Sequence, residues 1–163
     1  MNGTIEKCRE IAQNMGYSWI CATRPQAGEM LDRYRRQYST QVTPESRKTF
    51  PVIICIQPSG GRFEIDSLDN VRDIPSVLFA FAEPMKLDTP EPEMLAIIEE
   101  LKGVALHYTL ALRESGAFSS VSMAGDYNIT FDRYDANLCI LEQRVELTPK
   151  VGECVDKYLQ ETW

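Results

Sequence analysis

Residues 93–118 read EMLAIIEELKGVALHYTLALRESGAF. Apolar side chains recur in this segment at intervals of three and four residues, which places them on one face of a helix. The stripe consists of Met94, Leu95, Ile97, Ile98, Leu101, Val104, Ala105, Tyr108 and Leu112. It predicts one long amphipathic helix between Pro90 and Ser115, with Leu101 and Tyr108 buried against a sheet.

The residues on either side of this helix predict where it begins and which strands it packs on. Asp88 and Glu91 have the spacing of a capping box at the N-terminal end. Beyond the helix, up to three strands are predicted, at Val121–Met123, Tyr127–Asp132 and Leu138–Leu147. Apolar and charged residues alternate in the last of these strands, which predicts one buried face and one solvated face.

The N-terminal half predicts two further helices and more strands. The expected elements are a helix Thr4–Met15, a strand Tyr17–Ala22, a short helix within Pro25–Tyr38 and an interior strand Val77–Ala82. Between the second helix and the strand Val77–Ala82, residues 50–56 read FPVIICI. This apolar run is typical of a strand covered on both faces. Pro58–Gly61 is predicted to turn the chain into a more exposed return strand, Arg62–Asp66.

These elements together predict an α+β fold, a single-domain sandwich with a long amphipathic helix packed on a mixed, mainly antiparallel sheet. The chain has 163 residues, of which 44% are apolar, and this is enough for one sizeable core. Residues 1–163 are therefore expected to form one globular domain, in which 151–163 is a short C-terminal tail.

Charge is divided unevenly along the chain, whose formal net charge is -7. Residues 24–48 contain six basic and three acidic residues, whereas residues 62–100 contain three basic and ten acidic ones. Complementary potentials steer association, so the basic segment of one copy can attract the acidic segment of another. A solvated surface without a partner is the alternative for either segment. The acidic total argues against direct nucleic-acid binding, which needs clustered lysines and arginines.

The five cysteines are widely spaced and form no Cys-x-x-Cys pair. Cys21, Cys55 and Cys139 lie in apolar, strand-like runs, where cysteine behaves as a small hydrophobe. All five cysteines, including Cys8 and Cys154, are expected to be free thiols. Neither a signal peptide nor a membrane span is recognisable, so we expect the protein to fold in a cytoplasm and to contact no membrane.

No pattern of residues predicts catalysis, a cofactor site or a metal site. His107 is the only histidine, and no metal ligand lies three or four positions away from it, so a surface or edge-of-core position is expected. Glu99 and Glu100 point about a third of a turn apart and therefore do not converge as a general acid-base pair. The turn PSGGR at 58–62 lacks the spacing of a phosphate-binding loop and precedes a strand. We therefore expect no enzyme activity.

Four stretches carry a resemblance to a known family. They are FPVIICI at 50–56, VLFAFAEPMKLD at 77–88, the helix at 93–118 and YDANLCILEQRVEL at 134–147. In this order, between Tyr17 and Cys154, the chain resembles tail terminator or tail completion proteins of tailed bacteriophages. The resemblance implies a sandwich fold that forms homo-oligomeric rings, caps the tail tube and joins it to the head. It also implies tail-tube and neck or connector proteins as partners, a place in the virion after assembly in the host cytoplasm, and no active-site residues.

Two functional hypotheses remain open. The first is a ring-forming structural protein of the virion, either a tail terminator or another neck component. The second is a small non-enzymatic binding module, of regulatory or immunity type, that presents an acidic face to a basic partner; a small enzyme ranks third. The predicted subunit interface of the ring consists of Arg33, Arg35 and Arg36 on one copy and Asp66, Asp69 and Asp73 on the next.

Overall fold

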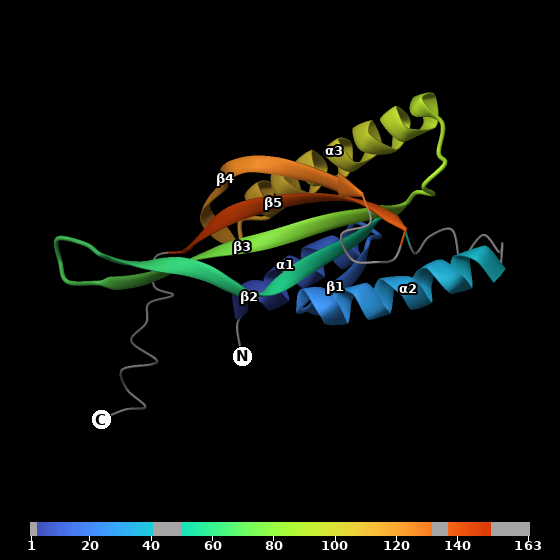
Figure 1. Cartoon of the computed structure of the whole chain (residues 1–163). Coiled ribbons are helices and arrows are strands. Elements are labelled where there is room, and N and C mark those ends of the chain that lie inside the picture. The colour runs from blue at the N-terminus through green and yellow to red at the C-terminus, as the bar shows by residue number, and fades with distance from the viewer. Residues whose placement is uncertain (1–2, 41–49, 132–136, 151–163) are drawn as a thin grey trace.

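The computed structural model describes residues 3–40, 50–131 and 137–150. Its elements are α1 (Gly3–Asn14), β1 (Ser18–Ala22), α2 (Arg24–Thr40), β2 (Val52–Ile65), β3 (Val71–Pro84), α3 (Glu91–Glu114), β4 (Phe118–Phe131) and β5 (Leu138–Pro149). The five strands form one sheet in the order β1-β2-β3-β5-β4 (Figure 1). β1 pairs with β2 in parallel, and the other three pairings are antiparallel. The predicted fold class is therefore confirmed.

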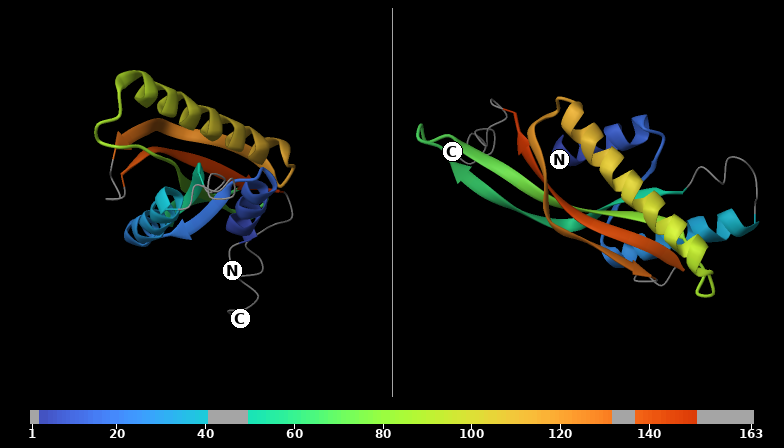
Figure 2. Two further views of the ribbon diagram at one scale, coloured as in Figure 1. Left: turned by 90° about the vertical axis from the view of Figure 1, so that its right-hand side faces the viewer. Right: turned by 90° about the horizontal axis from the view of Figure 1, so that it is seen from above.

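Helices cover both faces of the sheet, as the two views in Figure 2 show. α1 and α3 pack on one face, and α2 packs on the other. Successive side chains of a strand point to opposite faces, so Ile53 and Cys55 of β2 face α1 and α3, while Ile54 faces α2. Cover on both faces explains why β2 begins as an unbroken apolar run.

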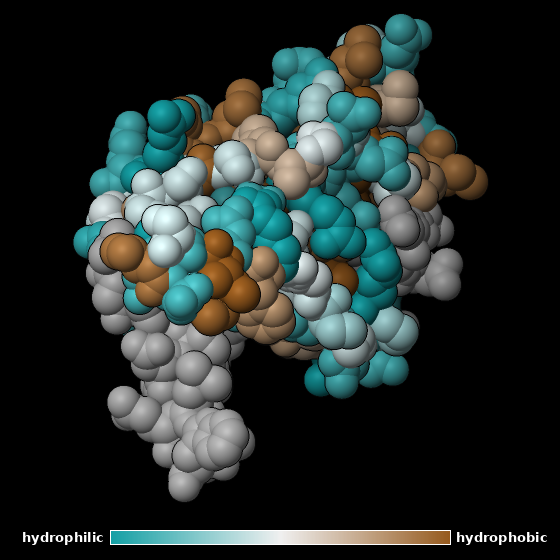
Figure 3. All heavy atoms as spheres, turned by 90° about the vertical axis from the view of Figure 1, so that its left-hand side faces the viewer, coloured by the Kyte–Doolittle hydropathy of each residue, from teal (hydrophilic) through white to brown (hydrophobic). Residues whose placement is uncertain are grey.

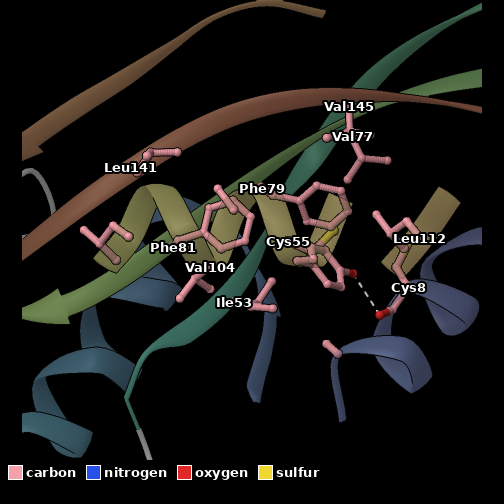
Figure 4. Packing of buried hydrophobic residues seen from close by; sticks show 14 of the residues in the cluster. Cys8, Ile53, Cys55, Val77, Phe79, Phe81, Val104, Leu112, Leu141 and Val145 are labelled. Carbon is pink, nitrogen blue, oxygen red and sulfur yellow. Dashed lines mark hydrogen bonds between the residues drawn. The ribbon is translucent and has the colours of Figure 1, made fainter. Parts of the chain in front are cut away.

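Tyr108 joins α3 to the rest of the core. Its ring meets that of Phe79 edge to face, with 5.3 Å between the centroids and 87° between the planes. Its hydroxyl donates a hydrogen bond of 2.8 Å to the carbonyl oxygen of Cys8 in α1, the dashed line in Figure 4. Tyr108 and Leu101 are completely buried, as predicted, and burial raises the pKa of the Tyr108 hydroxyl.

The predicted turn at Pro58–Gly61 is wrong. β2 continues through these residues to Ile65, with an irregularity in its pairing to β3 between Ile56 and Gly60. A bulge can hold a proline, which has no N–H to donate to the ladder, and the strand then resumes. The chain turns instead at residues 66–70.

Three smaller predictions are also wrong. The two strands expected after the long helix are one strand, β4, whose pairing shifts between Ala124 and Asn128, where Gly125 has a φ of 76°. α3 starts after Pro90 without a side-chain cap, so the capping box is not formed. Leu95, assigned to the buried stripe, is exposed, because it lies to one side of its neighbours Met94 and Ile98, which pack against the core.

β2 and β3 extend beyond the rest of the sheet as a two-stranded arm, residues 60–76 (Figure 1). The pairing of β3 with β5 stops at Ser76, so beyond this residue the two strands of the arm pair only with each other, as far as Ile65 opposite Val71. The two strands approach closely at its base, where a Cβ on Gly61 would lie 2.9 Å from the Ile74 carbonyl oxygen. We call this segment the β2–β3 arm.

Candidate functional site

The β2–β3 arm exposes apolar side chains. Phe63, Ile65 and Leu68 are 72%, 69% and 80% exposed. Figure 3 views the molecule from the arm end, where hydrophobic side chains lie beside hydrophilic ones. Exposed apolar residues that gather on one projection mark an interaction site more often than residues scattered singly. The arm is therefore the first candidate surface.

Phe63 and Ile65 share one face of the arm, because they are two residues apart on one strand. They pair with Asp73 and Val71 of β3. Alternation along β3 makes this face continuous with the one that Val77 presents to the core under α3. The apolar face of the sheet thus continues onto the arm, where no helix of the described residues covers it.

The acidic residues predicted to form half of the interface all lie on the arm. Asp66 shapes its turn: one carboxylate oxygen accepts hydrogen bonds from the N–H groups of Leu68 (2.8 Å) and Asn70 (3.0 Å), and the other accepts one from the Asn70 side chain (3.0 Å). These hydrogen bonds lower the pKa of Asp66, and the one from the Asn70 side chain has the largest effect. Asp69 has a φ of 60°, and Asp73 is exposed.

The basic residues predicted to face them belong to α2. Arg33 is exposed, and the side chains of Arg35 and Arg36 lie outside the described part of the structure. α2 lies at the other end of the sheet from the arm, in both Figure 1 and Figure 2. The structure therefore brings the three aspartates together on one projection and keeps them apart from these arginines within one chain.

A shallow groove between α3 and β4 is the second candidate surface. Its lining includes Lys102 and Leu106 from α3, Met123 and Tyr127 from β4, and Leu141 and Gln143 from β5. Its volume is about 120 Å³. Leu106, Met123 and Tyr127 are each exposed by between 42% and 53%. An apolar residue outside the core stripe of the helix, such as Leu106, was the sequence signal for this surface, and it was missed.

The polar groups of the groove already have partners inside it. The buried side chain of Gln143 donates to the carbonyl oxygens of Ala124 (3.4 Å), Gly125 (3.3 Å) and Arg144 (2.9 Å), so it satisfies carbonyls at the irregularity in β4. The Lys102 ammonium lies 5.8 Å from the ring centroid of Tyr127 and 3.2 Å from a carboxylate oxygen of Glu99. What remains open is an apolar surface with one cation at its rim.

Two carboxyl groups do converge, and they are not the pair Glu99 and Glu100 that the sequence analysis considered and excluded. Glu83 at the end of β3 hydrogen-bonds Glu100 of α3. The pKa of Glu83 is raised to about 8. Burial is the largest cause, and the charge of Glu100 and the hydrogen bond to it add to the effect. The sequence analysis considered Glu99, the chain neighbour of Glu100. In the folded chain, the carboxyl group next to that of Glu100 belongs to Glu83. The same Glu100 charge adds to burial in raising the pKa of Tyr17.

The remaining chemistry is sparse within the described ranges. No group of three or more histidine, cysteine, aspartate or glutamate side chains there could hold a metal ion, and no helix there is long and apolar enough to cross a membrane. His107 is exposed, as expected. The four described cysteines are free thiols, as predicted, but Cys21 is exposed on the edge strand rather than buried. Burial raises the pKa of Cys8 to about 12, and Cys154 lies outside the described residues.

Comparison with known proteins identifies no family for this chain. No protein-family model matches the chain, and no curated protein matches it. The function must therefore be inferred from the sequence itself and from the arm, the groove and the distribution of charge.

Proposed function

We propose that this chain is a structural subunit of a phage virion, a tail terminator or neck component that assembles head to tail into a ring. In that role it caps the tail tube and joins it to the head, with tail-tube and connector proteins as neighbours. The proposal starts from the family resemblance of the four sequence stretches described above. It gains support from the positions of the charged surfaces.

The separation of opposite charges to opposite ends of the molecule is the observation that carries the proposal. The arm contains four acidic and two basic residues, and α2 contains four basic and two acidic ones. Different surfaces that match each other on one chain produce head-to-tail contacts, which close into a ring when the rotation per subunit divides a full turn. A twofold dimer would instead require each surface to match itself.

The expected strength of the charged contact is modest. Exposed ion pairs contribute about 0 to 1 kcal/mol each, and salt screens them over a Debye length of about 10 Å at 0.1 M. Charges at the rim of an interface chiefly raise the rate of encounter and fix the orientation of the partners. We therefore expect these residues to select the head-to-tail arrangement rather than to hold it alone.

Charge reversal tests the proposal in particles of the phage that encodes the chain. Arg33→Glu and Asp73→Arg are each expected to give fewer particles with finished tails of normal length, and the combined exchange is expected to restore them in part. Asp66 is left unchanged because its carboxylate holds the turn of the arm. Lys86→Glu, an exposed site in the loop after β3, is the matched control. Normal tails and infectivity in both single variants would remove this surface from the mechanism.

The small binding module remains the second candidate function. The observation that favours it is the arm itself, an exposed acidic projection that suits a basic protein partner. The two candidates differ in where the protein is found. A ring component is expected in purified particles at a fixed number of copies, measured by quantitative mass spectrometry, and its absence from particles would favour the binding module.

A further inference from the structure

Two free cysteines lie next to each other on neighbouring strands. Cys21 of β1 is the register partner of Cys55 of β2 in the parallel pairing of these strands. Both are free thiols. Neighbouring strands run about 4.8 Å apart, and the Cα atoms that a disulfide joins are usually about 4.4 to 6.8 Å apart. The backbone therefore holds the two residues at a separation that a disulfide can span.

The two side chains also share one face of the sheet. Cys55 belongs to the core under α1 and α3, whereas Ile20 and Ala22 belong to the core on the α2 face. Alternation along β1 therefore turns Cys21 to the same face as Cys55. The two thiols interact there: burial is the largest cause that raises the pKa of Cys55, and the charge of Cys21 and a hydrogen bond with it add to the effect.

Access from solvent distinguishes the two thiols. Cys21 is exposed on the edge strand, whereas Cys55 is completely buried. Redox-reactive cysteines are typically accessible to solvent and have a second cysteine beside them that resolves the oxidised form. The side-chain amide of Gln57 donates a hydrogen bond of 3.3 Å to the Cys55 sulfur, which opposes the effect of burial and favours the thiolate. Cys21 thus has the position of the thiol attacked first, and Cys55 that of the resolving thiol.

We propose that Cys21 and Cys55 form a peroxide-sensitive pair that closes into a reversible disulfide. The Cys21 sulfur, as its thiolate, attacks one oxygen of hydrogen peroxide, the O–O bond breaks, and the other oxygen leaves as water with the proton that Cys21 lost. Cys21 is then a sulfenic acid. The Cys55 sulfur attacks the Cys21 sulfur, the S–S bond forms as the S–O bond breaks, and the hydroxyl group leaves as a second water with the Cys55 proton. Two thiols are oxidised and one peroxide is reduced.

The strand spacing favours a disulfide that is easily reduced. Side chains of register partners point in the same direction, so their Cβ atoms lie at about the strand spacing, whereas a disulfide holds its Cβ atoms about 3.8 Å apart. Strained disulfides are more readily reduced than relaxed ones. We therefore expect a dithiol reductant to restore both cysteines by exchange.

The disulfide would tether an edge of the sheet. Among the described strands, β1 lies at the edge and pairs only with β2. A bond between Cys21 and Cys55 would close a loop that contains α2. Such a cross-link restricts the unfolded chain and thereby stabilises the folded one. Oxidation is thus expected to hold β1 and α2 more firmly on the sheet. This inference goes beyond the proposed function and does not depend on it.

Cys8 of α1 is the competing partner for Cys55. Its charge also contributes to the raised pKa of Cys55. Cys8 is completely buried, however, and burial raises its own pKa to about 12. A pair of Cys8 and Cys55 therefore has no exposed thiol that peroxide can oxidise first. Exposure selects Cys21 as the partner.

Peroxide treatment of the purified full chain tests the pair. The reduced protein is treated with hydrogen peroxide, the remaining thiols are alkylated, and the intact protein and its peptides are analysed by mass spectrometry. We expect an intact mass lower by two hydrogen atoms before alkylation, a peptide pair joined through Cys21 and Cys55, and the return of both thiols after dithiothreitol. The oxidised protein is also expected to unfold at a higher urea concentration than the reduced protein.

Two variants sharpen the test. Cys55→Ala keeps the exposed thiol and removes its partner, so we expect no internal link and a Cys21 sulfenic acid that dimedone traps. Cys139→Ala, which removes a buried free thiol of β5, is the matched control and is expected to form the link as the parent protein does.

The unmodified chain alone decides the outcome, so it does not matter whether Cys55→Ala folds. The proposal is refuted if peroxide leaves Cys21 and Cys55 as thiols, or if it takes Cys21 to the sulfinic acid while Cys55 stays a thiol. It is equally refuted if either residue links to another cysteine of the chain or to a second copy. None of these results depends on whether the protein occurs in phage particles, so failure here leaves the proposed function untouched.

Discussion

Replacing Glu83 by glutamine should remove part of the dependence of stability on pH. The pKa of Glu83 rises from 4.5 to about 8 on folding, because burial and the neighbouring Glu100 disfavour its ionised form. Between these two values the folded state holds a proton that the unfolded state has lost. The stability that this proton supports is therefore greatest at low pH and is lost as the pH rises towards 8.

The size of the effect follows from linkage. One proton held only by the folded state changes the free energy of unfolding by about 1.4 kcal/mol per pH unit. Glu83 is half-buried and solvent screens its charge, so we expect about half of that slope, or about 2 kcal/mol between pH 5 and pH 8. Glutamine imitates the protonated acid, because it is neutral and its side-chain amide can donate a hydrogen bond to Glu100.

Urea unfolding at four pH values between 5 and 8 measures this difference. Glu83→Gln should match the parent protein at pH 5 and exceed its stability at pH 8. Glu99→Gln is the matched control, since Glu99 precedes Glu100 on α3 but its side chain is exposed and pairs only with Lys102 within the described residues. A stability difference between parent and Glu83→Gln that stays constant from pH 5 to pH 8 would refute the shared-proton interpretation.

Three further predictions concern the core. Leu101→Ala should lower the free energy of unfolding by about 2 to 5 kcal/mol in urea melts, because Leu101 is completely buried on the side of α3 that packs on the sheet; a loss below about 1 kcal/mol would contradict this position. Tyr108→Phe should cost only about 0.5 to 1.5 kcal/mol by the same assay, because the ring contacts stay and one buried hydrogen bond is lost. A thiol reagent should modify Cys21 in the native protein, while Cys55 and Cys139 should react only after denaturation; equal rates would show that these two are accessible.

The sequence predicted those elements whose pattern is set by local periodicity. α3 spans Glu91–Glu114 against a prediction of Pro90 to Ser115, because one face of the helix repeats without a break for most of its length. The alternation in β5 held in part: Leu141 and Val145 lie in the core under α3 and Arg144 is exposed on the opposite face, but Glu142, which was expected on the solvated face, is buried. In both cases the pattern of neighbouring residues along the chain is enough to predict the type of element.

The candidate surfaces depended on contacts between distant segments, and these the sequence did not predict. Glu83 meets Glu100 only because β3 ends beneath α3, and no spacing along the chain encodes that distance. The groove similarly needs the second half of α3 to lie beside β4. Leu106 carried a partial signal, because an apolar residue outside the core stripe of a helix needs a second explanation.

The least accurate strand prediction coincides with the most unusual part of the molecule. A turn at Pro58–Gly61 would have given a short hairpin and no projection. The irregularity after Ile56 instead lets β2 continue, and the arm with its exposed Phe63 is the result. An exposed apolar ribbon invites unwanted pairing and gains no stability from a core, so its presence is easier to explain if a partner covers it. Local rules tend to fail where function imposes a second requirement on the same residues, and the arm fits that description.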